Sequence, residues 1–579
     1  MTKTSYTEEH VHAILEAKTK NVESRVNRDP TCCDDLDVRV TCLEKQATGI
    51  PFAEPINNDG NLYPVELATH PVFLSHVSEL SRLAPSLSAL RICDIERLGG
   101  TWWRNVENEC WIAVNPTNPC NMIVVTTQDF YSRLSRLSSI ALYTLDGGVT
   151  WNQADITLSK CQGPTLPRSD QDWDITDLPT VAFDLKGNAY MLVTSFNVGR
   201  DATGNFDEAN ILIKSTDGGQ SWTKPQHVTR DDGFSHFLDN VSIWNDPHRK
   251  NTLYQTTSDF LAEVGIGTEN FTLVSRTVDG GTTWQPSVIA VVTPASFGLT
   301  NAPIHVLDDV NNTLVLTVKT FGGNSQNSPA QFIVSRSSDA GETWSQSMIF
   351  DDWTLNTAID PADGTFIRAL VFYHDAAINS KNGNLYVVAQ DGRFAPPGLG
   401  GAFITMSSDG GLNWSDPIPV NPGTEDKQAF FPTVAVADDG TVGVLFYDFR
   451  FFKDGDMSLK TDVWLALYNS NLTSRKEIRL TPESFDARQY TSGRIFGTNG
   501  YFAGSYCKLQ ANGNDFVASF CVTNPPYGVE PAPVPTSVFT VEQRNRQDII
   551  FARVSRKKKC RKHRCHYKKH RSQNKKCKY

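Results

Sequence analysis

The long irregular segments of this chain collect side chains that could bind or cleave a polar ligand. Their carboxylates are Asp170, Asp172, Asp174, Asp231, Asp232, Asp391, Glu425, Asp448 and Glu483. Their arginines are Arg368, Arg393, Arg450, Arg488 and Arg494, and their aromatic side chains include Trp173, Phe394 and Tyr490. Carboxylates bind hydroxyl groups and flat aromatic faces stack on sugar rings, so this composition favours a carbohydrate site. Plain solvated loops are the alternative.

A short pattern that recurs five times indicates what positions these segments. It reads TLDGGVTW (144–151), STDGGQSW (215–222), TVDGGTTW (277–284), SSDAGETW (337–344) and SSDGGLNW (407–414). The five aspartates are separated by 71, 62, 60 and 70 residues, which is enough chain for one four-stranded sheet with its loops. Glycine permits a positive φ, and the carboxylate can accept hydrogen bonds from the N–H groups of the turn. We interpret the repeat as a structural hairpin clasp and its aspartates as non-catalytic.

The repeat, S/T-x-D-x-G-x-T-W, is similar to the Asp-box or BNR motif, and the chain resembles the sialidase-like β-propeller family. Similar stretches lie between the repeats, in WIAVNPTNPCNMIVV from Trp111, PTVAFDLKGNAYMLV from Pro179, INSKNGNLYVVAQDGRF from Ile378 and FFPTVAVADDGTVGVLFYDFR from Phe430. The resemblance covers about residues 105–554 and implies an all-β propeller of four-stranded blades. Asp-box propellers include sialidases, other glycoside hydrolases and non-catalytic binding proteins, so this fold does not determine the function.

The strand and turn signals predict seven units, which start near Trp111, Thr180, Asn240, Ala302, Ala377, Thr433 and Tyr501. We therefore expect seven blades, and six, the number in sialidases, is the alternative. The last unit shows only three strands, so we expect a strand from before Trp111 to complete its sheet and remove a free edge. Strand alternation places the short turns and the Asp-boxes on one side of the ring, the Asp-box face. The long loops lie on the other side, the long-loop face.

The resemblance to sialidases implies roles for residues of the long-loop face. Three arginines would bind the carboxylate of a sialoside, and the candidates are Arg393, Arg450 and, as the third, Arg494 or Arg104. The other candidates are Tyr490 as the nucleophile, Glu425 or Glu483 as its partner, and Asp172 or Asp174 as the acid.

Two departures from the sialidase pattern keep other functions open. The F/Y-R-I-P segment expected at the first blade is absent, and the most similar stretch, RICDIERLGGTWWRN from Arg91, lacks the proline. The sequences DGR and DFR, which contain Arg393 and Arg450, also fit a simple Asp–Arg pair at the end of a strand. Three hypotheses follow: hydrolysis of a glycan, non-catalytic binding of a glycan or protein, and a structural role, for example in a viral particle.

The two ends of the chain differ from the propeller region. In residues 1–104, a capping box at Ser5-x-x-Glu8 and an apolar stretch at 72–83 predict a small, partly helical N-terminal extension. Residues 555–579 carry 13 Lys/Arg and no Asp or Glu, whereas residues 1–554 carry 41 Lys/Arg against 64 Asp/Glu. We expect this C-terminal tail to be disordered on its own and to bind a polyanion. Nucleic acid, an anionic membrane or polysaccharide surface, and the acidic propeller itself are the candidate partners.

The composition excludes a protein that spans a membrane with helices, because 39% of the residues are hydrophobic and no apolar stretch approaches the ~18 residues needed. The first residues, MTKTSYTEEHVHAILEAKTK, carry charges where a secretory signal has an apolar core. A virion or the host cytoplasm is therefore considered, with secretion as the alternative. The 12 cysteines include no CxxC pair, so we expect thiols or partial disulfide pairing and no metal or cofactor.

Overall fold

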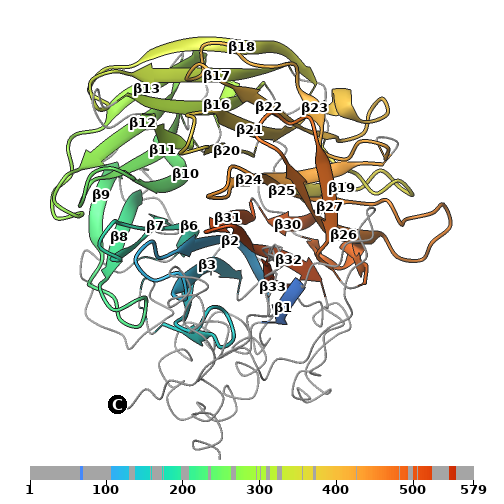
Figure 1. Ribbon diagram of the computed structural model, residues 1–579, viewed down its shortest axis with the longest axis horizontal. Helices are drawn as coiled ribbons and strands as arrows, with labels where there is room; N and C mark the ends of the chain where they lie inside the picture. Colours follow the sequence, from blue (N-terminus) through green and yellow to red (C-terminus); the bar gives the residue numbers. More distant parts are fainter. Residues whose placement is uncertain are drawn as a thin grey trace, which may run out of the picture. The chain divides into compact units, whose positions relative to one another are not determined.

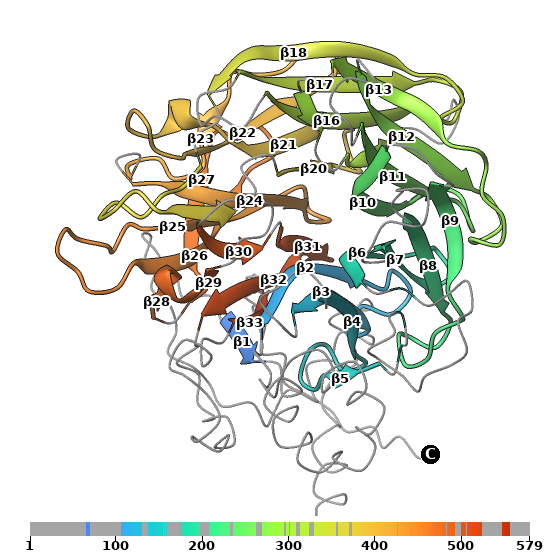
Figure 2. The ribbon, with the colours of Figure 1, turned by 180° about the vertical axis from the view of Figure 1, so that it is seen from behind.

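The computed structural model describes residues 65–69, 106–129, 137–154, 156, 158, 173, 175–196, 208–231, 236–261, 269–294, 297–299, 302–307, 313–322, 329–354, 357–369, 373–424, 427–481, 483–492, 500–504, 506–523 and 547–555. These residues form an all-β, seven-bladed propeller whose sheets succeed one another around a ring (Figure 1, Figure 2). The expected fold and the count of seven blades are confirmed, and the alternative of six is wrong. The predicted N-terminal helices and residues 556–579 of the tail lie outside the described residues.

The first four blades follow the chain in order. Blade 1 contains β2 (Val106–Val114), β3 (Met122–Asp129), β4 (Leu137–Thr144) and β5 (Asn152–Gln153). Blade 2 contains β6 (Ile175–Phe183), β7 (Ala189–Phe196), β8 (Glu208–Ser215) and β9 (Gln226–Asp231). Blade 3 contains β10 (His236–Asn245), β11 (Leu253–Leu261), β12 (Glu269–Thr277) and β13 (Val288–Pro294). In blade 4 the innermost strand is split, so the blade contains β14 (Phe297–Leu299), β15 (Ile304–Val306), β16 (Leu314–Gly322), β17 (Pro329–Ser337) and β18 (Ser345–Thr354).

The remaining blades complete the ring. Blade 5 contains β20 (His374–Ile378), β21 (Leu385–Gln390), β22 (Ala402–Ser407) and β23 (Ile418–Pro419). Blade 6 contains β24 (Ala429–Val436), β25 (Val442–Asp448), β26 (Lys460–Tyr468), β27 (Arg475–Arg479) and the short β28 (Phe485–Asp486). Blade 7 contains β31 (Lys508–Asn512), β32 (Asp515–Thr523), β33 (Gln547–Val554) and β1 (Val65–Thr69). A separate small sheet contains β19 (Phe366–Ala369), β29 (Thr491–Ser492) and β30 (Gly500–Gly504), and the two 3-10 turns are η2 (Gly392–Phe394) and η3 (Ala487–Gln489).

The second strand of a blade is buried on both faces. All six residues of β21 and all seven of β25 are buried. Such strands read as nearly continuous apolar runs, because both of their faces pack against other strands or blades. The run LYVVAQ in β21 and the run VGVLFYD in β25 follow this rule, and each ends in a polar residue at the long-loop face.

The ring closes where the first and last blades meet. β1 pairs antiparallel with β33, from Val65 opposite Val554 to Thr69 opposite Ile550. β33 also meets the first strand of blade 1, where Val106 pairs with Gln547. The blue and red ends of the described chain accordingly lie side by side (Figure 1). The expectation that a strand from before Trp111 completes the last sheet is therefore confirmed.

Each of the five repeats, which we call Asp-boxes after the motif they resemble, is held by a repeated set of hydrogen bonds. In the third box, Thr277 Oγ1 donates to Asp279 Oδ1 at 2.8 Å, and Gly281 N donates to Thr277 Oγ1 at 3.0 Å. Thr283 donates through N at 2.9 Å and through Oγ1 at 2.6 Å to the two oxygens of Asp279. The residue after the aspartate has a positive φ; it is glycine in four boxes and Ala340, at φ 64°, in the fourth box of the chain. These contacts confirm the interpretation of the repeat as a hairpin clasp.

The clasps predict a loss of stability in acid. Hydrogen bonds from Thr283 lower the pKa of Asp279 to about 2, and equivalent bonds lower the pKa of Asp339 and Asp409 to about 2. A carboxyl whose pKa is lower in the folded state contributes stability above the pKa of the unfolded chain and loses it as the pH falls through the folded pKa. We expect the melting temperature to fall between pH 4 and pH 2, and to fall less in Asp279→Asn than in the wild type. Equal slopes in a thermal scan would contradict this assignment.

A second set of contacts joins each Asp-box to the preceding blade. In every box the carbonyl of the residue after the aspartate accepts a hydrogen bond from a side chain of the blade before it. The donors and acceptors are Asn121 to Gly218 (2.8 Å), Lys214 to Gly280 (3.2 Å), Arg276 to Ala340 (2.9 Å), Arg336 to Gly410, and Arg553 to Gly147 (3.4 Å). We call these five contacts the latches. Arg553, in the last blade, holds the box of the first blade and so completes the circle.

The centre of the ring is filled by an ion pair that joins non-adjacent blades. Lys508 Nζ, on β31, lies 2.7 and 2.8 Å from the two carboxylate oxygens of Asp375, on β20. The same ammonium lies 4.6 Å from the ring centre of Trp111 and 5.4 Å from that of Trp244. The Asp375 carboxylate also accepts from Thr433 Oγ1 at 2.6 Å. Innermost strands of five blades therefore meet at this cluster.

Candidate functional site

Three turns of the sequence Asp-x-Arg organise the long-loop face over blades 5 and 6. They start at Asp391, Asp448 and Asp486, each at the end of a strand or in the turn after it. In each turn the aspartate Oδ1 accepts from the backbone N–H of the arginine two residues later, at 2.9, 3.3 and 3.1 Å. The carboxylate thus stabilises the turn without the need for a ligand.

Arg393 and Arg450 fold back onto the aspartates of their own turns. Arg393 Nε and Nη2 lie 2.8 and 2.7 Å from Asp391 Oδ2. Arg450 Nε and Nη2 both lie 2.6 Å from Asp448 Oδ2. The Asp–Arg pair at the strand end, which the sequence left as an alternative for DGR and DFR, is therefore present in both turns.

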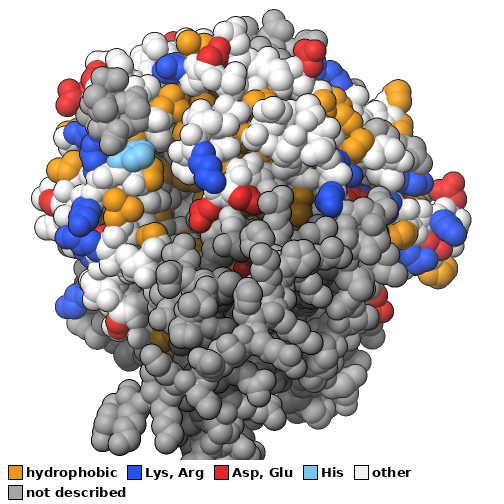
Figure 3. All heavy atoms as spheres, in the orientation of Figure 1, with side chains coloured by type: hydrophobic (Ala, Val, Ile, Leu, Met, Phe, Trp, Pro, Cys, Tyr) orange, Lys and Arg blue, Asp and Glu red, His pale blue; other side chains and the backbone are white. Residues whose placement is uncertain are grey.

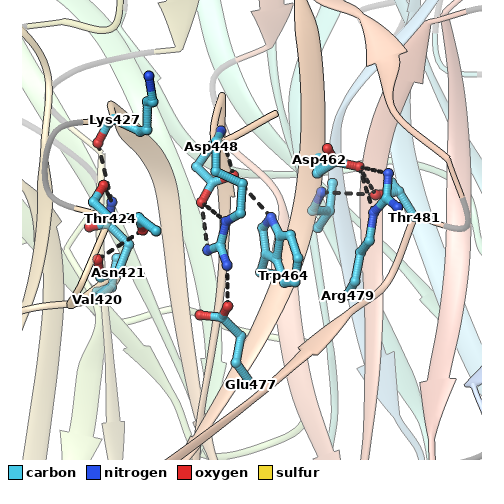
Figure 4. Close-up of polar contacts among 12 residues, drawn as sticks. Val420, Asn421, Thr424, Lys427, Asp448, Asp462, Trp464, Glu477, Arg479 and Thr481 are labelled. Atoms are coloured by element: carbon cyan, nitrogen blue, oxygen red, sulfur yellow. Dashed lines mark hydrogen bonds and ion pairs between the residues drawn. The ribbon is translucent and has the colours of Figure 1, made fainter. Parts of the chain in front are cut away.

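Arg450 contacts the two outer strands of its own blade. Its guanidinium lies 3.6 Å from the ring centre of Trp464 on β26, and Nη1 donates to Glu477 on β27 (Figure 4). Glu477 also accepts from Arg475, whose Nη2 donates to the carbonyl of Val420 in blade 5 at 2.8 Å. Arg450 is thus part of a charge network at the boundary of two blades.

Arg479 and Arg488 are held in the same way at the edge of this network. Arg479 Nε and Nη2 lie 2.9 and 2.6 Å from Asp462 Oδ1, a carboxylate that also binds Thr481 (Figure 4). Arg488 makes a two-bond contact with Asp360, at 2.5 and 3.0 Å. Each of these carboxylates is buried, so each pair is largely shielded from solvent.

The buried carboxyl of Asp448 gives this network a pH dependence. Burial raises the pKa of Asp448 to about 7, against the opposing effect of Arg450. A carboxyl with a raised folded pKa binds a proton that the unfolded chain has already lost, so the free energy of unfolding falls as the pH rises from about 4 to about 7. Asp448→Asn cannot ionise but keeps an acceptor for Trp464 Nε1, which donates to Asp448 at 3.0 Å. We expect denaturant titrations to show a smaller fall across this range in the variant, and an unchanged fall would contradict this role for Asp448.

Tyr490, the candidate nucleophile, is part of the hydrophobic core. Its side chain is 1% exposed, and its hydroxyl donates to the carbonyl of Cys521 at 3.1 Å. Burial raises its pKa well above the usual value, which is the opposite of what activates a phenol as a nucleophile. In this conformation Tyr490 packs between blades 6 and 7. No described contact joins it to Arg393 or Arg450.

The other candidates are described in part. Asp172, Asp174, Glu425, Arg494 and Arg104 lie outside the described residues, and Glu483 is exposed on a loop of blade 6. Their assignments stay predictions.

A pair of carboxylates near the start of two neighbouring innermost strands was not among the candidates. Thr127 Oγ1 lies 3.2 Å from Glu109 Oε2 and 2.8 Å from Asp177 Oδ1, so these oxygens are no more than about 6 Å apart. Paired carboxyl groups of glycoside hydrolases are about 5 to 9 Å apart. Glu109 has a positive φ of 55° at a β-bulge, and a similar bulge follows Asp177. The sequence offers one signal for this pair, because the first strands of units 1 and 2 each carry an acidic residue near their start, Glu109 and Asp177.

The described residues show both states of cysteine and no metal-binding group. Cys120 is disulfide-bonded, whereas Cys110, Cys507 and Cys521 are buried free thiols. No cluster of three or more His, Cys, Asp or Glu side chains among the described residues could hold a metal ion. In the same part of the chain, no helix has the length and apolar character needed to cross a membrane.

Comparisons with known proteins show similarity to other propellers at low identity. No protein-family model matches the chain, and no curated protein matches its sequence. Among solved structures, a Dyadobacter fermentans protein of unknown function is 12% identical over 78% of this chain and 96% of its own, with a TM-score of 0.38. A Trypanosoma rangeli sialidase is 17% identical over 65% of this chain and 55% of its own, with a TM-score of 0.36. A Penicillium chrysogenum α-L-arabinanase is 12% identical over 66% of this chain and 98% of its own, with a TM-score of 0.38.

Proposed function

We propose that this protein is a carbohydrate-binding propeller whose ligand lies on the long-loop face. The observation that carries the proposal is Phe451, a large apolar side chain that is 42% exposed on the loop between β25 and β26. Phe449 and Phe452, on the same loop, are only 1% and 5% exposed. Two buried neighbours therefore anchor the loop while Phe451 stays at the surface, where a sugar ring could stack on it.

The network beneath Phe451 holds this ring in place. The guanidinium of Arg479 lies 4.9 Å from the ring centre of Phe451, and the ring of Trp464 lies 6.0 Å away. Both supporting groups are themselves fixed, Arg479 by Asp462 and Trp464 by Asp448. A rigid aromatic ring loses little conformational entropy when a ligand binds, which favours its use as a platform.

A glycan array probed with the full chain tests the proposal. We expect binding to at least one glycan, and we expect Phe451→Ala to weaken that binding about tenfold, which corresponds to about 1.4 kcal/mol of lost stacking. The matched control is Leu412→Ala, which removes an apolar side chain that is 66% exposed in an Asp-box on the opposite side of the ring. Binding to no glycan, or equal loss in both variants, would contradict the proposal.

Hydrolysis of a glycan is the second candidate function, and the Glu109–Asp177 pair is the observation that favours it. We expect Glu109→Gln and Asp177→Asn each to lower turnover of a glycoside at least a hundredfold if this pair acts as acid and base. The same assay tests the earlier predictions, because Arg393→Ala, Arg450→Ala, Arg494→Ala and Tyr490→Phe would abolish turnover in a sialidase-type site. If the wild type cleaves no member of a panel of glycosides, the hydrolysis hypothesis is contradicted and only carbohydrate binding is retained.

A further inference from the structure

Three arginines of the long-loop face, Arg393, Arg450 and Arg488, are each paired with a carboxylate of the protein. Recognition of a carboxylate by arginine relies on two parallel bonds from one guanidinium. Arg393 and Arg450 direct Nε and Nη2 to their own aspartates, and Arg488 makes its two-bond contact with Asp360. None of these three guanidinium groups can present that edge to a ligand without breaking a contact to a buried carboxylate.

The charges around Phe451 are compensated within the protein. Arg479 pairs with Asp462, and Lys460 pairs with Asp456 at 3.0 Å. Lys453 and Asp454, adjacent and exposed on the same loop, have opposite signs. The space-filling view shows Lys/Arg and Asp/Glu side chains of both signs on its visible face (Figure 3). The surroundings of Phe451 therefore offer no excess positive charge to attract an anion.

What the loop does offer suits an uncharged ring. Phe451 presents an apolar face for the C–H groups of a sugar, and a second apolar side chain of the same loop, Met457, is 94% exposed. Ion-paired side chains at the rim keep lone pairs and N–H groups that can bond to hydroxyls without a net charge on the ligand. The combination of an aromatic face with a neutral polar rim is complementary to a hexose or pentose ring without a carboxylate.

We infer that Phe451 and the compensated network around it form a subsite for a neutral sugar residue, and not for sialic acid. This inference rests on the proposed function, because it assigns a ligand class to the same face. It differs from what the resemblance to sialidases implies, since sialosides carry a carboxylate, whereas Arg393, Arg450 and Arg488 are each paired with a carboxylate of the protein itself.

The test compares pairs of oligosaccharides that have the same neutral core with and without a terminal sialic acid. Dissociation constants for the full chain are measured by calorimetry at low and high sodium chloride. We expect the neutral member to bind at least as tightly as its sialylated partner, with less than a twofold change between 50 and 500 mM salt. We also expect Phe451→Ala to weaken binding about tenfold and Phe451→Trp, which keeps the stacking face, to retain it.

The outcomes separate this inference from the proposed function. If no glycan binds, carbohydrate recognition fails and the subsite fails with it. Tenfold tighter, salt-sensitive binding of the sialylated members would overturn the neutral subsite alone, as would equal affinity of Phe451→Ala and the wild type for the neutral members. Melting temperatures of the variants identify any loss that comes from unfolding, and Leu412→Ala is the control for removal of an exposed side chain.

Discussion

Replacement of Lys508 by methionine is expected to lower the free energy of unfolding by about 3 to 5 kcal/mol. The methionine keeps the apolar stem against Trp111 and Trp244 but removes the charge that compensates Asp375 at the ring centre. Asp375 is 0% exposed, so its carboxylate would be left with hydrogen bonds from Thr433 and the backbone but without a counter-ion. Unfolding in denaturant, followed by tryptophan fluorescence, measures this loss directly.

The double variant Lys508→Met, Asp375→Asn shows whether the buried charge is the cause. Because the asparagine has no charge to compensate, we expect it to recover at least half of the stability lost in the single variant. Lys214→Met is the control, since Lys214 also binds another blade but through a carbonyl and not a carboxylate. A loss below about 1 kcal/mol for Lys508→Met, in the range of an exposed ion pair, would show that the central pair contributes little.

Deletion of residues 1–70 is expected to destabilise the propeller and to promote self-association. The deletion removes β1, the strand that pairs with β33 from Ile550 to Val554. The loss is expected to be on the order of 3 kcal/mol, from ladder hydrogen bonds worth about 1 kcal/mol each. An uncovered strand edge also offers a template for pairing with a second chain.

Deletion of residues 1–60 is the matched control, because it keeps β1 and removes most of the same extension. Sedimentation velocity and thermal melting compare the two truncated chains at equal concentration. We expect the 1–60 deletion to have the same melting temperature and oligomeric state as the full chain. The 1–70 deletion is expected to have a lower melting temperature and to form larger species. Identical behaviour of both truncations would show that blade 7 is stable without its fourth strand.

The sequence predicted those parts of the fold that depend on local turn chemistry. An Asp-box needs a hydroxyl, a carboxylate and two successive residues with a positive φ within eight positions, so its bonds can be anticipated from the sequence alone. The tolerance of Ala340 in the fourth box shows that the bonds around Asp339 specify the turn even without the first of the two glycines. The spacing of the boxes then predicted the blades.

The candidate site could be predicted only in part, because it depends on contacts between distant strands. The sequence identified Arg393 and Arg450 as strand-end arginines, but two partners of Arg450, Trp464 and Glu477, come from two other strands. Tyr490 was placed among the long irregular segments, and only the packing of blade 7 shows that its hydroxyl meets the carbonyl of Cys521.

The centre of the ring had no signal in the sequence at all. Lys508 and Asp375 are separated by 133 residues, and neither belongs to a motif. A lysine near the start of a strand is ordinarily solvated, and its burial here follows from the meeting of innermost strands from five blades.

The latches have a consequence for the order in which the ring can assemble during synthesis. Four of the five donors precede their acceptors in the chain, so each new Asp-box leaves the ribosome after the side chain that will hold it. Gly147 is different, because its partner Arg553 is made 406 residues later. The contact of the blade 1 box can therefore form only after nearly the whole protein has been synthesised. In a nascent chain that stops short of Arg553, the ring is not closed and the carbonyl of Gly147 lacks its side-chain donor.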